Sequence, residues 1–246
     1  MTDDEPKLRS ADKIPPPYKL GAFPRGFTTR VGGRLIALFA TQSSPSVTGD
    51  QWEEIFAHAI GATWKPSNIG LDDIVLSNCC WGAKTVKGAT APGARIRLIS
   101  GRNSPAFSYG TNDVKAMAPG DVGRQVLKIW NARVDSVRAR FAHVRVVVLV
   151  KSKEHNQFAV FEHETLRFDP DLYRWSWNRR GNLEGHHGET GEHRFTWQPH
   201  GSQFTIIERI PENAVVFRIQ EPPKLDPDSI LLGIGFSDQW VQVVIP

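Results

Sequence analysis

The stretch "NCCWGAKTVKG" at residues 78–88 follows the short apolar run "DIVLS" at 73–77, and the pair is typical of a β-hairpin. Lys84 and Lys87 stand on an otherwise apolar strand, a few residues after the carboxylates of Asp72 and Asp73. An ordinary amphipathic hairpin with solvated lysines explains this pattern. A metal-dependent nuclease site explains it as well, and the rest of the chain decides between the two.

Two helices are predicted from apolar residues at helical spacing. The first covers about 50–60, where Asp50 and Glu53 resemble a capping box and Gly61 suits a helix C-cap. The second covers about 121–141, where a stripe of valines runs with Trp130. The predicted strands are 73–77, 82–87, 94–100, 143–151, 157–165, 204–210, 214–220 and 240–245. Residues 29–44 contain a short apolar stretch, and 166–203 is expected to be irregular.

This order of elements predicts an α/β sandwich with a mixed central sheet flanked by helices. Residues 1–28 are polar and proline-rich, so we expect a flexible N-terminal arm. Residues 29–246 form one predicted domain. Its catalytic core is placed at about 48–165, and a mainly irregular and β-rich recognition region at about 166–246.

Composition limits the class of protein. The 246 residues are 40% hydrophobic and 23% charged, enough for a large core without disulfides. The two cysteines are adjacent, at 79 and 80, so no disulfide framework is expected, and adjacent cysteines without a second pair do not suit zinc. No apolar run reaches the length of a membrane span, and no signal peptide is recognised. We therefore expect a soluble cytoplasmic protein, and the net charge of +4 only weakly favours a polyanionic partner.

Phosphodiester hydrolysis at neutral pH typically uses a divalent cation held by carboxylates, with a lysine nearby. Asp73, as a metal ligand, and Lys84, as a catalytic residue, suit this chemistry, and the carbonyl of Ala83 is a further expected metal ligand. An acid is expected two residues before Lys84, where this chain has Gly82. Glu53, at the flank of the first helix, is the predicted replacement. Its alternative role is helix capping, and the reserve acids are Asp72 and Glu54.

The arrangement resembles the PD-(D/E)xK restriction-endonuclease superfamily, in which a helix bearing "WE" precedes an Asp…xxK hairpin. The phrases "WGAKTVK", "RLISGRNSPAFSYG", "IWNARV" and "TWQPHGSQFTI" resemble bacterial type II restriction endonuclease-like proteins over about residues 48–220. The resemblance implies an Mg²⁺-dependent homodimer that cuts double-stranded DNA at a short sequence, with a cognate methyltransferase in the host. The alternatives are a catalytically inactive DNA-binding module on the same fold and an RNA or structure-specific nuclease.

Residues that suit DNA contacts gather in two segments, because arginine suits guanine edges and asparagine or glutamine suits adenine. The first is the loop "GRNSP", with Arg102, Asn103 and Ser104, which is otherwise a simple turn. The second segment, 174–204, is otherwise an irregular aromatic subdomain. Its candidates are Arg179, Arg180, Asn182, His187, Arg194, Gln198, His200 and Gln203. His186 and His187 are interpreted as lacking a metal partner.

Overall fold

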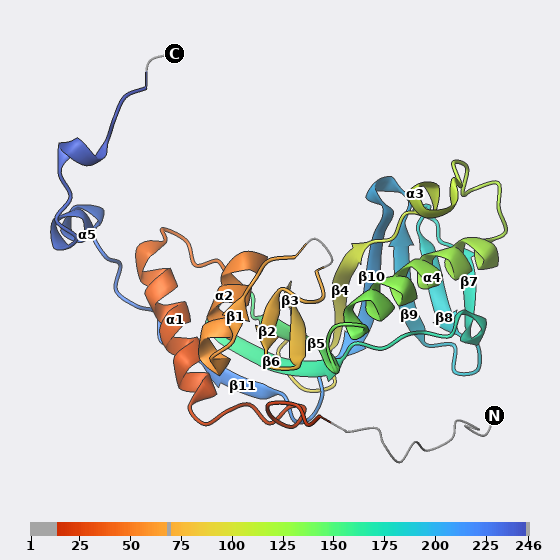
Figure 1. The fold of residues 1–246 in the computed structure, drawn as a ribbon, viewed down its shortest axis with the longest axis horizontal. Helices are drawn as coiled ribbons and strands as arrows, with labels where there is room; N and C mark the ends of the chain where they lie inside the picture. The colour runs from red at the N-terminus through yellow and green to blue at the C-terminus, as the bar shows by residue number, and fades with distance from the viewer. Residues whose placement is uncertain (1–13, 68–69, 245–246) are drawn as a thin grey trace.

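The computed structural model describes residues 14–67 and 70–244. These residues form a mixed α/β fold with a six-stranded mixed sheet, a five-stranded antiparallel sheet and five α-helices (Figure 1). The general α/β class predicted from the sequence is therefore confirmed. The two sheets lie side by side, and β3 and β4 are the neighbouring strands where they meet.

The six-stranded sheet holds the predicted hairpin near its centre. Its order is β1 (Thr63–Trp64), β2 (Ile74–Leu76), β3 (Cys79–Lys87), β5 (His143–Lys151), β6 (Gln157–Glu164) and β11 (Val215–Arg218). Only the β3–β5 pair is parallel. Helices α1 (Phe27–Thr41) and α2 (Gly49–Ile60) cover one face, where Trp52 and Phe56 pack on Trp81 and Val147.

The five-stranded sheet joins one strand from the middle of the chain to the four strands between residues 173 and 209. Its order is β4 (Arg95–Arg102), β10 (Gln203–Arg209), β9 (His193–Gln198), β8 (Leu183–His187) and β7 (Tyr173–Trp177). Helix α4 (Pro119–Arg138) lies along one face (Figure 1), where Trp130 and Val126 pack against Phe195 and Phe204. The remaining helices are α3 (Pro105–Tyr109) and α5 (Pro227–Gly233), with 3-10 turns at Pro170–Leu172, His200–Ser202 and Asp238–Trp240.

The first predicted helix is confirmed at Gly49–Ile60, with Gly61 as its left-handed C-cap, but its predicted capping box is wrong. Thr48 is the N-cap. Its hydroxyl accepts from the Gln51 backbone N–H (3.3 Å), and the Gln51 side chain accepts from the Thr48 N–H (2.9 Å). Glu53 takes no part in the cap and is free for another role.

Three other expectations differ from the structure. Residues 27–41 form a full helix, because Val31, Leu35 and Phe39 recur every four residues and are all buried. The segment expected to be irregular contains β7, β8 and β9. The predicted strand at 240–245 is absent from its described part, which pairs with no other strand.

Part of the predicted arm packs on the central sheet. Glu162 of β6 accepts hydrogen bonds from the Gly21 N–H (2.8 Å) and the Tyr18 hydroxyl (3.3 Å). The guanidinium of Arg145 donates to both Glu162 (3.0 Å) and the Tyr18 carbonyl (3.2 Å). These contacts hold residues 18–21 on the sheet, while 1–13 lie outside the described residues. No helix in the described part of the chain is long and apolar enough to cross a membrane.

Candidate active site and nucleic-acid interface

Asp73 and Lys84 lie on neighbouring strands and face the same side of the sheet. The β2–β3 register pairs Ile74 with Trp81, so one further step places Asp73 opposite Gly82. Lys84 follows Gly82 by two residues and therefore shares its face. Ala83, between them, turns its side chain into the core under α2. The predicted Asp73–Lys84 pairing is thus present in the geometry of the hairpin.

Asp73 is a buried carboxylate at the start of β2. Its side chain is 4% exposed, and the Ser67 backbone N–H donates to its Oδ1 atom (2.9 Å). Burial raises its pKa, although the Ser67 hydrogen bond and the charge of Lys84 act to lower it. The desolvated carboxylate would gain from a further positive charge.

Glu53 reaches the same place from helix α2. The indole N–H of Trp64, on β1, donates to its Oε2 atom (3.0 Å). Burial raises the pKa of Glu53, and the carboxylate of Asp73 raises it further, whereas Lys84 lowers it. The three charged groups are therefore close enough to influence one another, as a shared site requires.

Lys84 is desolvated within this cluster. Burial lowers the pKa of its amine, and the nearby guanidinium of Arg133 lowers it further, while Asp73 and Glu53 oppose the shift. The lowered pKa makes the neutral amine more populated than in an ordinary lysine. Only the neutral amine accepts a proton, so the shift is in the direction that general-base chemistry needs.

Arg133 is a site residue that the sequence did not single out. It projects from α4, and its Nη1 donates to the Ser100 carbonyl (2.9 Å) and to Asn103 Oδ1 (3.1 Å). Gly101 admits this guanidinium, because a Cβ there would stand 2.2 Å from Nη1. Only the tertiary fold brings Arg133 of α4 near Lys84 of β3, so no local pattern signals it.

The two reserve acids have other surroundings. Asp72 pairs with Arg140 (2.8 Å) and accepts from the Ser67 hydroxyl (2.6 Å), so it fastens the loop before β2 to the end of α4. Glu54 is exposed and lines a separate hollow between α1 and α2. Glu53, whose pKa is raised by burial and further by the carboxylate of Asp73, therefore remains the candidate partner of Asp73.

Predicted DNA-contact residues line two hollows. Arg179, Arg180, Asn182 and Gln198 line the one that we call the recognition hollow, of about 550 Å³, with Arg97, Asn178, Glu184 and Thr196. Arg102 and Ser104 line the second, of about 470 Å³ between α3 and α4, with Lys128 and Arg133. Since Arg133 also acts on Lys84, the second hollow adjoins the candidate active site. These six candidates therefore line open, arginine-bearing surfaces.

Other candidates are occupied within the fold. The Asn103 side chain is fully buried, and its amide donates to the Val126 carbonyl (3.0 Å), so it offers DNA no exposed group. Arg194 forms two hydrogen bonds with Glu208 and one with the Ile207 carbonyl. His187 Nδ1 accepts weakly from the backbone of the turn that follows β8.

The remaining candidates lie at the surface. His200 is exposed, and Gln203 is partly exposed at the start of β10. The Ser104 hydroxyl accepts from the Phe107 N–H (3.2 Å) and so caps α3. Arg102, Arg179 and Arg180 are exposed and have the charge that phosphate contacts need.

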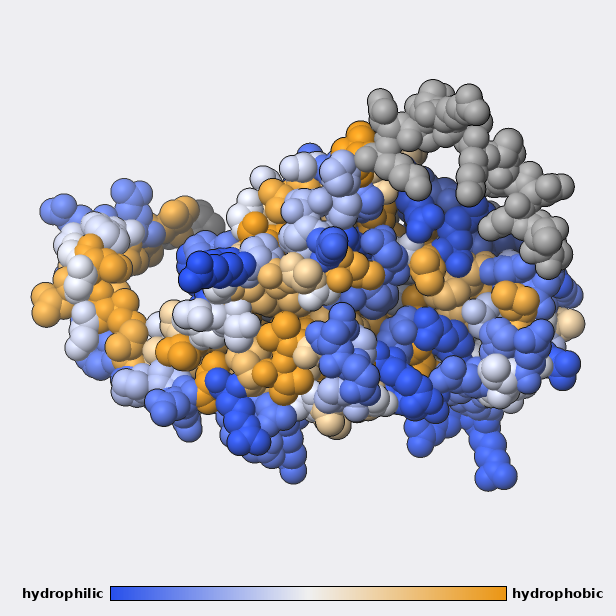
Figure 2. Space-filling view, turned by 90° about the horizontal axis from the view of Figure 1, so that it is seen from below, coloured by the Kyte–Doolittle hydropathy of each residue, from blue (hydrophilic) through white to orange (hydrophobic). Residues whose placement is uncertain are grey.

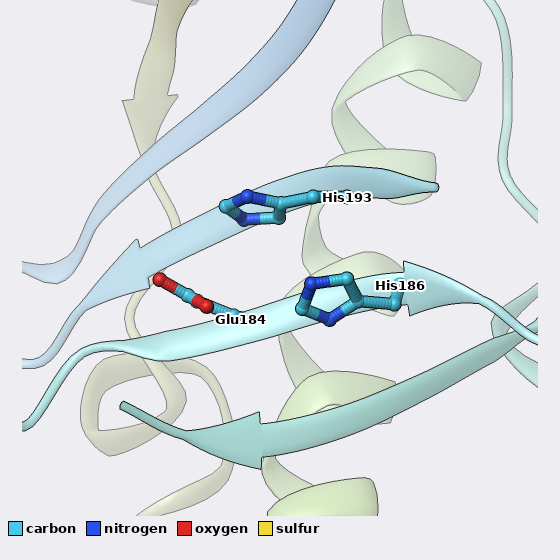
Figure 3. Close-up of side chains that lie close together, drawn as sticks. All are labelled: Glu184, His186 and His193. Carbon is cyan, nitrogen blue, oxygen red and sulfur yellow. The ribbon is translucent and has the colours of Figure 1, made fainter. Parts of the chain in front are cut away.

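The interpretation that His186 lacks a metal partner is wrong. Glu184, His186 and His193 each offer one ligand atom, and these atoms lie within 4.8 Å of one another (Figure 3).

No protein-family model matches the chain, and the search of curated proteins finds no match. Function is therefore argued from the sites themselves.

Proposed function

We propose that this chain is an Mg²⁺-dependent endonuclease of the type II restriction class, which hydrolyses phosphodiester bonds in double-stranded DNA at a short sequence. The observation that carries the proposal is the convergence of Glu53, Asp73 and Lys84. A structural ion pair needs no second carboxylate, so the cluster of two acids and one amine favours catalysis over an ordinary amphipathic hairpin.

The arrangement of elements supports a restriction endonuclease-like sandwich. Helix α2 bears Glu53 and precedes the β2–β3 hairpin that bears Asp73 and Lys84. Helix α4 then leads into β5, which pairs in parallel with β3. The five-stranded sheet adds a separate surface on the same domain, which suits target recognition.

The residues present fit a hard divalent cation. Burial raises the pKa of both Asp73 and Glu53, and the carboxylate of Asp73 raises that of Glu53 further, so a cation between them would offset this cost of ionisation. These two side chains and the Ala83 carbonyl would hold Mg²⁺, which prefers oxygen ligands and keeps several waters. Bound there, the ion supplies Lewis-acid polarisation of a phosphoryl oxygen.

The cationic residues have distinct proposed roles. The neutral form of Lys84, favoured by its lowered pKa, orients the attacking water and accepts its proton at Nζ. Arg133 lies next to Lys84 and also lines the hollow beside α3. Its guanidinium therefore faces the negative charge that develops on the phosphate.

A second copy of the chain is the proposed partner. The C-terminal arm from Pro227 to 244 projects from the body and carries many apolar groups (Figures 1 and 2). Leu232, Val243 and Val244 are each more than four-fifths exposed. Such an apolar arm gains by packing on another subunit, and two related sites suit a palindromic duplex. We further propose that the chain acts in the cytoplasm of a host that also contains the cognate methyltransferase.

Incubation of the purified full chain with phage DNA, with Mg²⁺ or with EDTA, tests the proposal. Discrete fragments with Mg²⁺ and none with EDTA are expected. Asp73→Ala and Lys84→Ala should each lower cleavage at least a hundredfold. Matched controls are Lys87→Ala, at the exposed end of the same strand, and Glu54→Gln, next to Glu53. Binding without cleavage would instead indicate an inactive DNA-binding module, and cleavage of RNA alone a different nuclease.

A further inference from the structure

Three potential metal ligands share the open face of the five-stranded sheet. Glu184 and His186 are two residues apart on β8, so their side chains point to the same side. His193, at the start of β9, pairs with His186. The three side chains converge in Figure 3, and their ligand atoms lie within 4.8 Å of one another.

A β-bulge creates this convergence. The register pairs Gly185 with Phe195 but His186 with His193, so Arg194 is the extra residue between the two pairs. Without the shift, Arg194 would stand opposite His186 in place of the second histidine. The shift therefore exchanges a cation for an imidazole at the position nearest to Glu184 and His186.

We propose that Glu184, His186 and His193 form a zinc site that braces the β8–β9 hairpin beside the recognition hollow. Two imidazole nitrogens and one carboxylate oxygen are a common zinc ligand set with a fourth position left for water. Mg²⁺ prefers oxygen ligands, so the set discriminates against the ion proposed for the active site. The zinc site does not depend on nuclease activity.

The separations require only a small closure. Tetrahedral zinc with bonds of about 2.1 Å holds neighbouring ligand atoms roughly 3.4 Å apart. Ligand atoms no more than 4.8 Å apart are therefore close to the spacing that a bound zinc ion needs. The ring centroids of the two histidines are already 4.7 Å apart.

Neighbouring groups orient the ligands. The Asn178 side-chain amide donates to Glu184 Oε1 (2.7 Å), which leaves Oε2 for a metal. His193 Nε2 lies 2.8 Å from the Phe195 carbonyl and 3.1 Å from the Thr196 hydroxyl. Contacts of this kind hold a ring in one orientation, as partners of metal-bound histidines commonly do. The cationic side chains of Arg97, Arg179 and Arg180 line the same hollow as Glu184, and their charge opposes a metal ion.

Zinc binding to the full chain, freed of metal with a chelator, is the decisive measurement. Calorimetric titration at pH 7.5 should give one zinc per chain, undiminished by millimolar Mg²⁺. His186→Ala and His193→Ala should each weaken binding at least tenfold, and so should Glu184→Gln, which keeps the acceptor for Asn178. His58→Ala, an exposed histidine on α2, is the matched control and should bind as the unaltered chain does.

Two further readouts keep the proposal falsifiable if a variant folds poorly. Co²⁺ in place of zinc should give the visible absorption of a tetrahedral or five-coordinate ion, and zinc should raise the melting temperature of the unaltered chain. Absence of zinc binding, or equal binding by the His186 and His193 variants, would overturn the site. Loss of DNA cleavage in Asp73→Ala with zinc binding retained would separate this site from the proposed nuclease centre.

Discussion

The backbone carbonyl of Gly70 occupies the space that a side chain on Gly82 would need. A Cβ at Gly82 would stand 2.7 Å from the Gly70 oxygen and 3.1 Å from the Leu71 Cα. The obstacle is backbone, which cannot swing aside as a flexible side chain can. The absence of an acid two residues before Lys84 is therefore built into the packing of the loop before β2, and Glu53 approaches from the helix instead.

Gly82→Asp should consequently destabilise the fold rather than restore a missing ligand. We expect a loss of about 1–3 kcal/mol, typical of overpacking, and cleavage no faster than that of the unaltered chain. Thermal or denaturant unfolding measures the first effect and a DNA cleavage assay the second. Gly88→Asp, where no atom lies within 4 Å of the added Cβ, is the matched control. Faster cleavage by a stable Gly82→Asp protein would mean that the acid belongs on β3.

The observed capping box assigns helix capping to Thr48 and Gln51, whereas the sequence pattern allowed Glu53 either a capping or a catalytic role. Because Thr48 and Gln51 form the capping box, Thr48→Ala should cost about 1 kcal/mol of stability and leave cleavage nearly unchanged. Glu53→Gln should do the opposite: cleavage falls at least a hundredfold while the melting temperature changes little, since the amide oxygen still accepts from Trp64. Cleavage retained by Glu53→Gln would remove Glu53 from the site.

The central hairpin and α2 were predictable because their information is local. The apolar runs of the two strands and the helical spacing from Trp52 to Ile60 follow directly from the residues. The capping box was misplaced because Thr48–Gln51 and Asp50–Glu53 both fit the same pattern two residues apart. Strand β7, "YRWSW", alternates aromatic and other residues, so the signal for a strand was present within the segment interpreted as irregular.

Other features depend on contacts between distant segments. Asn103 has the chemistry of a DNA-contact residue, yet it is completely buried, and its amide donates to the Val126 carbonyl of α4. The position of Arg133 depends on how its helix packs, and the Glu184–His186–His193 cluster depends on a β-bulge. Neither feature can be predicted from a local sequence pattern. The types of residue that carry chemistry were therefore predictable, but the directions in which their side chains point were not.

The free thiols give a prediction about pH. Burial raises the pKa of Cys79 from its ordinary value of 9.0 to about 12, and burial raises that of Cys80 as well. An unfolded thiol ionises first, so the stabilisation is complete below pH 9 and is lost as the pH rises toward 12. The melting temperature should fall as the pH rises from about 9 toward 12, and less steeply in a Cys79→Ala, Cys80→Ala double variant. Rapid thiol labelling of the native chain at pH 8 would contradict this burial.

Alanine substitutions at Arg180 and Arg194 should have different effects, the first on target recognition and the second on stability. Arg180 lines the recognition hollow and is exposed, so Arg180→Ala should cost about 1–3 kcal/mol on the target sequence and little on other DNA. Arg194→Ala leaves the carboxylate of Glu208 without its partner, so it should lower the melting temperature more than target discrimination. Binding titrations on target and random duplexes, with thermal unfolding of each variant, measure both effects. Unchanged discrimination in Arg180→Ala and Gln198→Ala would place recognition at the hollow beside α3.

The C-terminal arm should control the oligomeric state. It is fastened to α1 by the Leu225 N–H, which donates to the Ala40 carbonyl (2.8 Å), and by Lys224, which donates to the Phe39 carbonyl (3.0 Å). A chain that ends after Leu225 keeps both bonds and loses the exposed apolar groups of α5 and the residues beyond. Light scattering coupled to size-exclusion chromatography should find the full chain dimeric and the shortened chain monomeric.

The melting temperature at low protein concentration should be nearly unchanged, because the residues of the described arm beyond Leu225 are not buried in the body. A shortened chain that remains dimeric would place the interface on another surface, and a full chain that is monomeric at all concentrations would refute the proposed homodimer.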